Sequence, residues 1–439
     1  MSLSEIAYAG VRSPLFFILS LRLWQGGAGL LTTLLILRFL TPELQGWYYS
    51  FLGVAALYTL FDLGLSAVLL QVSAHTAVGL HWGVKYSPCG GSAAKFSALL
   101  GKAVRWYVLM AIVFLLLVLP GGYWFFSQQN VSTVAWHWPW LALCLFTAGS
   151  MVAMPFLSVL EGAGQILVVY RVRLVQAVLG SLCCWYLLVV GAELWATVMV
   201  SMLAVLCTSG WLLVRARSLL ALAWAESGVL YDWRNEVWPL QWRLGVSWLC
   251  SYMITQINIP ILFHMKGAVL AGQFGLSLTV VNTLGLISSS WIARHIPVMA
   301  QAVVEKNWKQ IDDIFFRDLG LSIVVFAVGA MILLFGYLLI DGSPLVTRFL
   351  PFWPFVGLFV YTFVNLLVAA WATYLRSFRR EPLLLPMVFC TLLIVPGVLV
   401  ATHWYSINGM IAVLDGVYLF VLLPVSWTIW RRCKIDWRS

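Results

Sequence analysis

Two charged side chains lie inside apolar segments of this sequence. Arg22 and Asp62 flank Thr41-Pro42-Glu43, which has the pattern of a helix N-cap, a first-turn proline and an early acid. Arg22 and Asp62 lie at nearly equal distances along the chain from Thr41. Two antiparallel helices would therefore carry these two side chains at the same depth, roughly 30 Å from the turn. A charge at the centre of a membrane helix costs about 3 kcal/mol. We therefore expect Arg22 and Asp62 to pair or to face a watery cavity.

The chemistry that Arg22 offers is phosphate binding. A guanidinium suits phosphate because its planar fork donates two hydrogen bonds at once and stays charged. One hypothesis is that Arg22, with the neighbouring Gln25, lines a cavity that binds an anionic headgroup, while Asp62 orients the arginine. The alternative is a structural ion pair that only fastens the two helices together.

Other polar residues are candidates for the same cavity or for ion coupling. The basic candidates, which could instead extend from helix ends to the membrane surface, are Arg38, Arg171, Arg173 and Arg243. Asp415 is either a proton or cation coupling site or an acid near a helix end; its candidate partners are Asn365, Gln256 and Asn258. No His or Cys lies at metal-ligand spacing, so we expect no metal site and no cofactor, with Na+ or H+ as the possible coupling ion.

The composition places these residues in a membrane. Of the 439 residues, 62% are hydrophobic and only 10% are charged, far from the usual values for soluble domains. A bilayer core about 30 Å thick needs about 20 apolar residues per helix. About twelve segments satisfy this length, the last two over 383–403 and 407–430. We predict an all-α, polytopic membrane protein with about 12 transmembrane helices.

The basic residues indicate the orientation. Most of the 26 Lys and Arg fall in every second connection or near the termini, which predicts that both termini are cytoplasmic. Topology and contact with anionic membrane lipids explain the net charge of +10, so we expect no nucleic-acid partner.

The longest inner connection near the midpoint predicts two six-helix lobes, residues 1–220 and 221–439. A short internal match with a constant offset supports them, because it pairs Gly46 with Gly272 and Arg38 with His264. An even number of helices separates the two copies. The lobes are therefore expected to be related by a pseudo-two-fold axis along the membrane normal.

The stretch from residue 37 to residue 66 resembles the first hairpin of polysaccharide repeat-unit flippases. These proteins belong to the multidrug, oligosaccharidyl-lipid and polysaccharide exporter (MOP) superfamily. The residues that carry the likeness are Leu37, Arg38, Phe39, Leu40, Pro42, Glu43 and Gly46 at the turn, and the DLG motif Asp62, Leu63 and Gly64.

The resemblance implies a function. The protein would translocate an undecaprenyl-diphosphate-linked oligosaccharide from the cytoplasmic to the periplasmic leaflet of a bacterial inner membrane, for O-antigen or other surface polysaccharide synthesis. It implies alternating access of two lobes around a cationic cavity, driven by a proton or sodium gradient, with Arg22 as the first candidate for the diphosphate. The implied partners are the lipid-linked oligosaccharide, membrane lipids, and the polysaccharide polymerase and chain-length machinery. Ser288 stands at the repeat position of Asp62, which leaves the coupling ion open.

Two other functions are open. A cation-coupled multidrug exporter of the same superfamily usually carries more acids in its first-half helices and exports cations, whereas Arg22 suits an anionic cargo. A membrane enzyme such as an acyltransferase or polymerase would need a longer outer loop or carboxylates there, and no nucleotide-binding glycine loop occurs. We therefore expect a transporter and no enzymatic activity.

Overall fold

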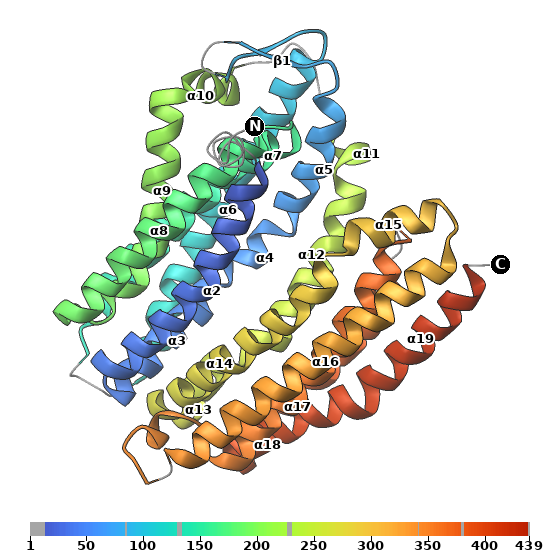
Figure 1. Ribbon diagram of the computed structural model, residues 1–439. Helices are drawn as coiled ribbons and strands as arrows, with labels where there is room; N and C mark the ends of the chain where they lie inside the picture. Colours follow the sequence, from blue (N-terminus) through green and yellow to red (C-terminus); the bar gives the residue numbers. More distant parts are fainter. Residues whose placement is uncertain are drawn as a thin grey trace, which may run out of the picture. The chain divides into compact units, whose positions relative to one another are not determined.

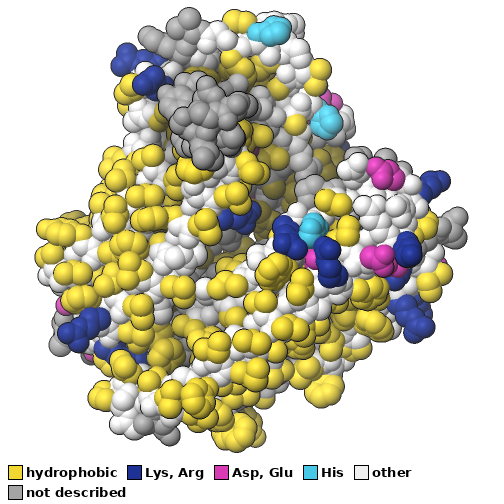
Figure 2. Space-filling model, in the orientation of Figure 1, with side chains coloured by type: hydrophobic (Ala, Val, Ile, Leu, Met, Phe, Trp, Pro, Cys, Tyr) yellow, Lys and Arg dark blue, Asp and Glu magenta, His cyan; other side chains and the backbone are white. Residues whose placement is uncertain are grey.

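The computed structural model describes residues 14–83, 86–129, 134–225, 231–340, 342–378 and 382–437. Within these ranges the chain is almost entirely helical, and its only strands, β1 (His81–Trp82) and β2 (Pro88–Cys89), form a short antiparallel hairpin. Eleven of the described helical stretches are long and apolar enough to cross a membrane. Hydrophobic side chains cover a large part of the face shown in Figure 2. Elsewhere in the described residues, too, large apolar side chains are exposed, and those of Leu116 and Phe335 are more than 60% exposed. The predicted polytopic, all-α fold is confirmed.

The last of the eleven stretches contains two spans. It runs from Leu384 to Asp436 as α18 (Leu384–Val417), the π-helical turn η3 (Tyr418–Leu422) and α19 (Leu423–Asp436). Ser406 interrupts α18 with φ 54° and ψ −138°, values that no helix accommodates. The break lies in the gap between the predicted segments 383–403 and 407–430. With it, the number of spans agrees with the predicted twelve.

The chain divides into two compact units. Unit 1 comprises residues 1–40 and 51–252, and unit 2 comprises residues 41–50 and 253–439. The predicted boundary at residue 220 therefore falls inside unit 1. In addition, the first turns of the second span, residues 41–50, pack with unit 2.

Unit 1 is a bundle of antiparallel helices (Figure 1). Its helices are α2 (Pro14–Phe39), α4 (Tyr58–Asp62), α5 (Leu65–Thr76), α6 (Ala93–Ser127), α7 (His137–Gly162), α8 (Ile166–Val190), α9 (Trp195–Arg215), α10 (Arg217–Trp224), α11 (Trp233–Glu236) and most of α12 (Trp238–Thr255). Helix α8 packs between α2 and α9, and α7 packs on α6 and α9. The indole of Trp24 donates to Ser181 Oγ at 2.9 Å, which fastens α2 to α8.

The segment after α10 stays with unit 1 because polar side chains hold it against α6. Lys95 of α6 forms an ion pair with Glu236 at 2.8 Å, and the Tyr231 hydroxyl donates to the other oxygen of Glu236 at 2.6 Å. Lys102 donates to the carbonyl of Tyr231 at 3.3 Å. Tyr231 and Glu236 follow the predicted boundary at residue 220, yet they contact α6 of unit 1. The spacing of residues along the sequence did not predict these contacts.

This arrangement predicts a pH dependence. The hydrogen bonds from Lys95 and Tyr231 lower the pKa of the Glu236 carboxyl below its ordinary value of 4.5. The contribution of Glu236 to stability is therefore fully present above pH 4.5 and is lost as the pH falls through the lowered pKa of the folded protein. Because both partners are partly exposed, we expect a loss of about 0.5 kcal/mol. As the pH falls below 4.5, amide exchange of α11, corrected for its intrinsic pH dependence, should accelerate in the wild-type protein. In the variant Glu236→Gln it should not.

Unit 2 begins with the first part of α3 (Pro42–Ala55). Its other elements are α13 (Asn258–Lys266), α14 (Ala268–Ala293), α15 (Ile296–Val304), α16 (Trp308–Leu339), the 3-10 turn η2 (Val346–Arg348), α17 (Phe352–Arg376), α18, η3 and α19. Helix α14 packs on α16 and α17, and α17 packs on α18 and α19.

Two glycines allow α3 to approach α14 within unit 2. A Cβ atom on Gly46 would lie 1.8 Å from the carbonyl oxygen of Ala268, and one on Gly272 would lie 2.7 Å from the Gly46 nitrogen. Beside them, the Gln45 amide donates to the carbonyl of Gly272 at 2.8 Å. The two glycines that the internal match pairs in sequence are therefore in direct contact.

Candidate functional site

The DLG motif forms a helix break inside the second span. Helix α4 ends at Asp62, Leu63 and Gly64 take left-handed conformations with φ 49° and 67°, and α5 begins at Leu65. A Cβ on Gly64 would lie 2.8 Å from the Cβ of Leu244, so only glycine fits at this point. The first backbone N–H groups of a helix have no acceptor in the preceding turn, so those at the start of α5 need acceptors from outside the helix.

The Asp62 side chain fills this break. It is fully buried and accepts from the Ser66 hydroxyl at 2.9 Å and from the Ser66 backbone N–H at 3.3 Å, as a helix-capping carboxylate does. Tyr107 of α6, which is also fully buried, donates its hydroxyl to Asp62 Oδ1. Asp62, Ser66 and Tyr107 therefore form a closed polar cluster, which we call the acid cluster.

The expected ion pair between Arg22 and Asp62 is not formed. Arg22 is exposed on α2, and α2 packs on α8, whereas α4 packs on α6. The two side chains do not come together, because they lie on helices with different neighbours. Arg22 and Gln25 both remain exposed on α2. Arg38 is exposed near the end of the same helix, about 24 Å from Arg22 along the axis.

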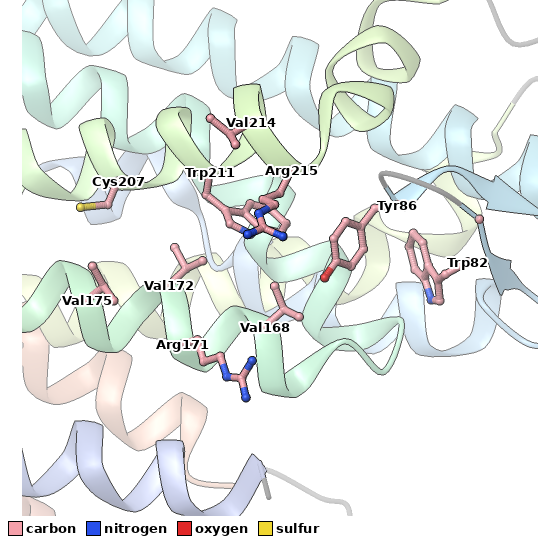
Figure 3. A pocket seen from close by; sticks show the side chains of 11 residues that line it. Trp82, Tyr86, Val168, Arg171, Val172, Val175, Cys207, Trp211, Val214 and Arg215 are labelled. Carbon is pink, nitrogen blue, oxygen red and sulfur yellow. The ribbon is translucent and has the colours of Figure 1, made fainter. Parts of the chain in front are cut away.

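The other predicted arginines have separate environments in unit 1. Arg173 forms an ion pair with Glu161 at 2.8 Å. The guanidinium of Arg243 lies 5.6 Å from the ring centre of its neighbour Trp242. Arg171 lines a pocket between α8 and α9, together with Arg215 (Figure 3). Among the described residues of unit 1, the predicted basic residues are thus distributed over several places.

Asp415 lies on α18 against α17. A Cβ atom on Gly357 would lie 2.8 Å from Asp415 Oδ2, so the glycine makes room for the carboxyl group. Asp415 Oδ1 is buried and has no hydrogen-bond partner among the described residues. The expected partners lie elsewhere: Asn258 donates to the carbonyl of Ile254 at 2.7 Å, and Asn365 lines a different pocket. A coupling role for Asp415 remains a prediction.

Three carboxamides meet in a pocket of unit 2. Gln256 follows α12, Asn282 lies in the middle of α14, and Asn365 lies in the middle of α17; all three side chains are exposed. They line a pocket of about 360 Å³, together with Tyr361 and Thr362. We call it the amide pocket.

The amide pocket is polar but uncharged. No acidic or basic residue lines it, and the Thr362 hydroxyl is buried without a hydrogen-bond partner among the described residues. Carboxamides and hydroxyls both donate and accept hydrogen bonds. The pocket can therefore bind hydroxyl, carbonyl or amide groups of a solute, and it offers no countercharge to an ion.

Several residues of these sites were not predicted from the sequence. Tyr107 and Arg215 lie near helix ends or among other polar residues, so nothing in the sequence marked them. Asn282 did carry a signal, because it is a carboxamide in the centre of a predicted membrane-spanning segment. Of the predicted residues, the structure brings Asn365 and Gln256 together, and it separates both from Asp415.

No protein-family model matches the sequence, and no curated protein matches it. Among solved structures, an inward-facing multidrug resistance MATE family transporter of the MOP superfamily matches with a TM-score of 0.64 at 13% identity, over 94% of this chain and 95% of that one. The MATE multidrug transporter DinF-BH matches with a TM-score of 0.62 at 13% identity, over 97% and 95%.

An outward-facing member of the same family also matches, with a TM-score of 0.56 at 13% identity over 98% of both chains. These three likenesses extend over nearly the whole length of each protein. At such low identity they establish the architecture alone. The chain therefore has the fold of the MATE family transporters of the MOP superfamily.

Proposed function

We propose that the protein is a membrane transporter that moves an organic solute across a bacterial inner membrane by alternating access. The observation that carries this proposal is the match of almost the whole chain to transporters of one fold solved in both inward-facing and outward-facing conformations. A fold that adopts both conformations suits a carrier. The basic residues in alternate connections support cytoplasmic termini.

The first candidate cargo is a drug-like amphipathic molecule. The solved structures of this fold reported above are described as multidrug transporters. A multidrug exporter needs a polar and adaptable binding surface, and the amide pocket offers hydrogen-bonding groups without a fixed charge. Under this proposal an ion gradient drives export, with H+ or Na+ as the coupling ion.

The second candidate cargo is a lipid-linked oligosaccharide, which the DLG hairpin favours. Arg22 and Gln25 are exposed on α2, and neither residue is tied into an ion pair within the described part of the chain. An exposed guanidinium can bind a diphosphate, and the amide pocket can bind sugar hydroxyls or acetamido groups. Under this proposal the polysaccharide polymerase is a downstream partner.

One pair of assays separates the two cargoes. In a bacterium lacking its own drug exporters, a multidrug exporter is expected to lower ethidium accumulation and raise the inhibitory concentration of cationic dyes. In the native strain, a flippase is expected to be required for surface polysaccharide, and its deletion should accumulate lipid-linked precursor in the cytoplasmic leaflet. If neither phenotype is observed, with the protein present in the membrane, both cargo proposals are wrong.

Two variants refine the result. Asn365→Leu removes one carboxamide from the amide pocket and should reduce transport of either cargo at unchanged protein abundance. Arg22→Gln should impair transport of the diphosphate cargo and leave dye export at its normal rate. Arg38→Gln is the matched control, because it removes an exposed arginine from the same helix.

A further inference from the structure

The pocket of unit 1 that Arg171 and Arg215 line has two unlike ends. It has a volume of about 740 Å³ and lies where α8 begins and α9 ends, beside the β1–β2 hairpin (Figure 3). Arg171 of α8 and Arg215 of α9 line it, and we call it the arginine pocket. Since α8 and α9 are packed side by side, both arginines lie at the same end of the helix pair.

Aromatic rings surround the basic end. Tyr86 follows the β1 strand, and its ring centre lies 5.4 Å from that of Trp211 on α9. Trp82 of β1 lies 6.1 Å from Tyr86 on the other side. Figure 3 shows Tyr86 between Trp82 and the Trp211 and Arg215 pair. Tyrosine and tryptophan rings of this kind collect at the level of lipid headgroups, because they have an apolar body and a polar edge.

The deeper end of the pocket is apolar. Val172 and Val175 of α8 line it opposite Cys207 of α9. From Arg171 to Val175 the helix rises about 6 Å, so the lining changes from basic to apolar over about one turn. The pocket therefore matches a molecule with a negative head and a hydrocarbon tail.

The two arginines lack a protein counterion. Among the described residues, neither Arg171 nor Arg215 forms an ion pair, whereas the nearby Arg173 is paired with Glu161. Arg171 contacts a ring instead, with its guanidinium 4.9 Å from the centre of Phe17. A guanidinium that is held near the headgroup level without a carboxylate is suited to a phosphate oxygen.

We propose that the arginine pocket binds an anionic phospholipid, with the headgroup phosphate beside Arg171 and Arg215 and an acyl chain along Val172 and Val175. Basic pockets between membrane helices on the cytoplasmic side bind anionic headgroups in this way. The site lies outside both the acid cluster and the amide pocket. It therefore does not depend on which cargo the protein carries, and it predicts that activity or stability responds to the anionic lipid content of the membrane.

Native mass spectrometry of the purified protein tests this proposal. Titration with phosphatidylglycerol is expected to give a saturable, tightly bound lipid, and phosphatidylcholine is not. The double variant Arg171→Gln/Arg215→Gln should weaken the binding of phosphatidylglycerol about 30-fold, given the usual contribution of a basic residue near an anionic lipid surface. The matched control Arg217→Gln/Arg432→Gln removes two exposed arginines outside the pocket and should bind as the wild type does.

A second measurement tests where the lipid binds in a protein that retains Arg171 and Arg215. In a variant that retains Cys207 and carries alanine at the other seven cysteines, phosphatidylglycerol should slow maleimide labelling of Cys207 several-fold relative to phosphatidylcholine. Equal labelling in the two lipids, or equal losses of affinity in the pocket and control double variants, would overturn the proposal. Protection of Cys207 by inorganic pyrophosphate as strong as that by phosphatidylglycerol would assign the pocket to a soluble phosphate compound and equally overturn it.

Discussion

Replacing Gly46 with alanine is expected to lower the free energy of unfolding by about 3 kcal/mol, because the new methyl group has no space. Its Cβ would lie 1.8 Å from a backbone oxygen of Ala268, and backbone cannot rotate away as a flexible side chain can. Helix α3 would have to separate from α14, which also breaks the hydrogen bond from Gln45 to Gly272. Thermal unfolding in detergent, followed by size-exclusion chromatography, measures the loss.

Gly26→Ala is the matched control for Gly46→Ala. Both glycines lie in membrane-spanning helices, but a Cβ on Gly26 would meet no atom within 4 Å. Alanine also has the higher helix propensity, by up to about 1 kcal/mol. Gly26→Ala should therefore be as stable as the wild type or slightly more stable. Equal stability of the two variants would show that α3 and α14 do not pack as closely as the structure indicates.

Asp62→Asn is expected to abolish ion-driven transport and to leave the fold intact. Asparagine is nearly isosteric and can still accept from Tyr107 or Ser66, so the loss of stability should not exceed about 1 kcal/mol. It cannot take up and release a proton, and it has no charge for a cation. If Asp62 couples transport to an ion gradient, uphill transport stops while downhill exchange of cargo continues. Transport into proteoliposomes, measured separately under proton and sodium gradients, distinguishes these two activities.

Three further variants show whether the effect belongs to the carboxylate. Asp62→Ala should cost about 1–3 kcal/mol, because it leaves the buried Tyr107 and Ser66 hydroxyls without their acceptor. Tyr107→Phe keeps the carboxylate and should retain coupling. Asp415→Asn tests the acid of α18 in the same assay. Normal uphill transport by Asp62→Asn under both gradients would limit Asp62 to capping the break between α4 and α5.

The sequence predicted the features that depend on the local chain. Apolar segment lengths predicted the spans, including the break that the structure places at Ser406. The DLG motif was singled out only by the family resemblance, and the sequence did not predict the helix break that the structure shows there, where Gly64 takes a φ of 67° beside Leu244. The domain boundary was not predictable in this way, since Lys95 and Glu236, which hold the segment beyond residue 225 to α6, are 141 residues apart.

Counting residues along the sequence predicted the depth of each polar group. The tertiary structure decided which neighbouring helix its side chain contacts. The rise of about 1.5 Å per residue converts chain distance into an expected depth, and on that basis alone Arg22 and Asp62 were predicted to lie at one level. Each residue also turns the helix by about 100°, and small errors at helix ends change the face that a side chain occupies. Packing of α2 on α8 and of α4 on α6 therefore decided the partners: Asp62 contacts Tyr107, and Arg22 is left exposed. Those contacts arise between segments far apart in sequence, where only the summed packing of whole helices selects a neighbour.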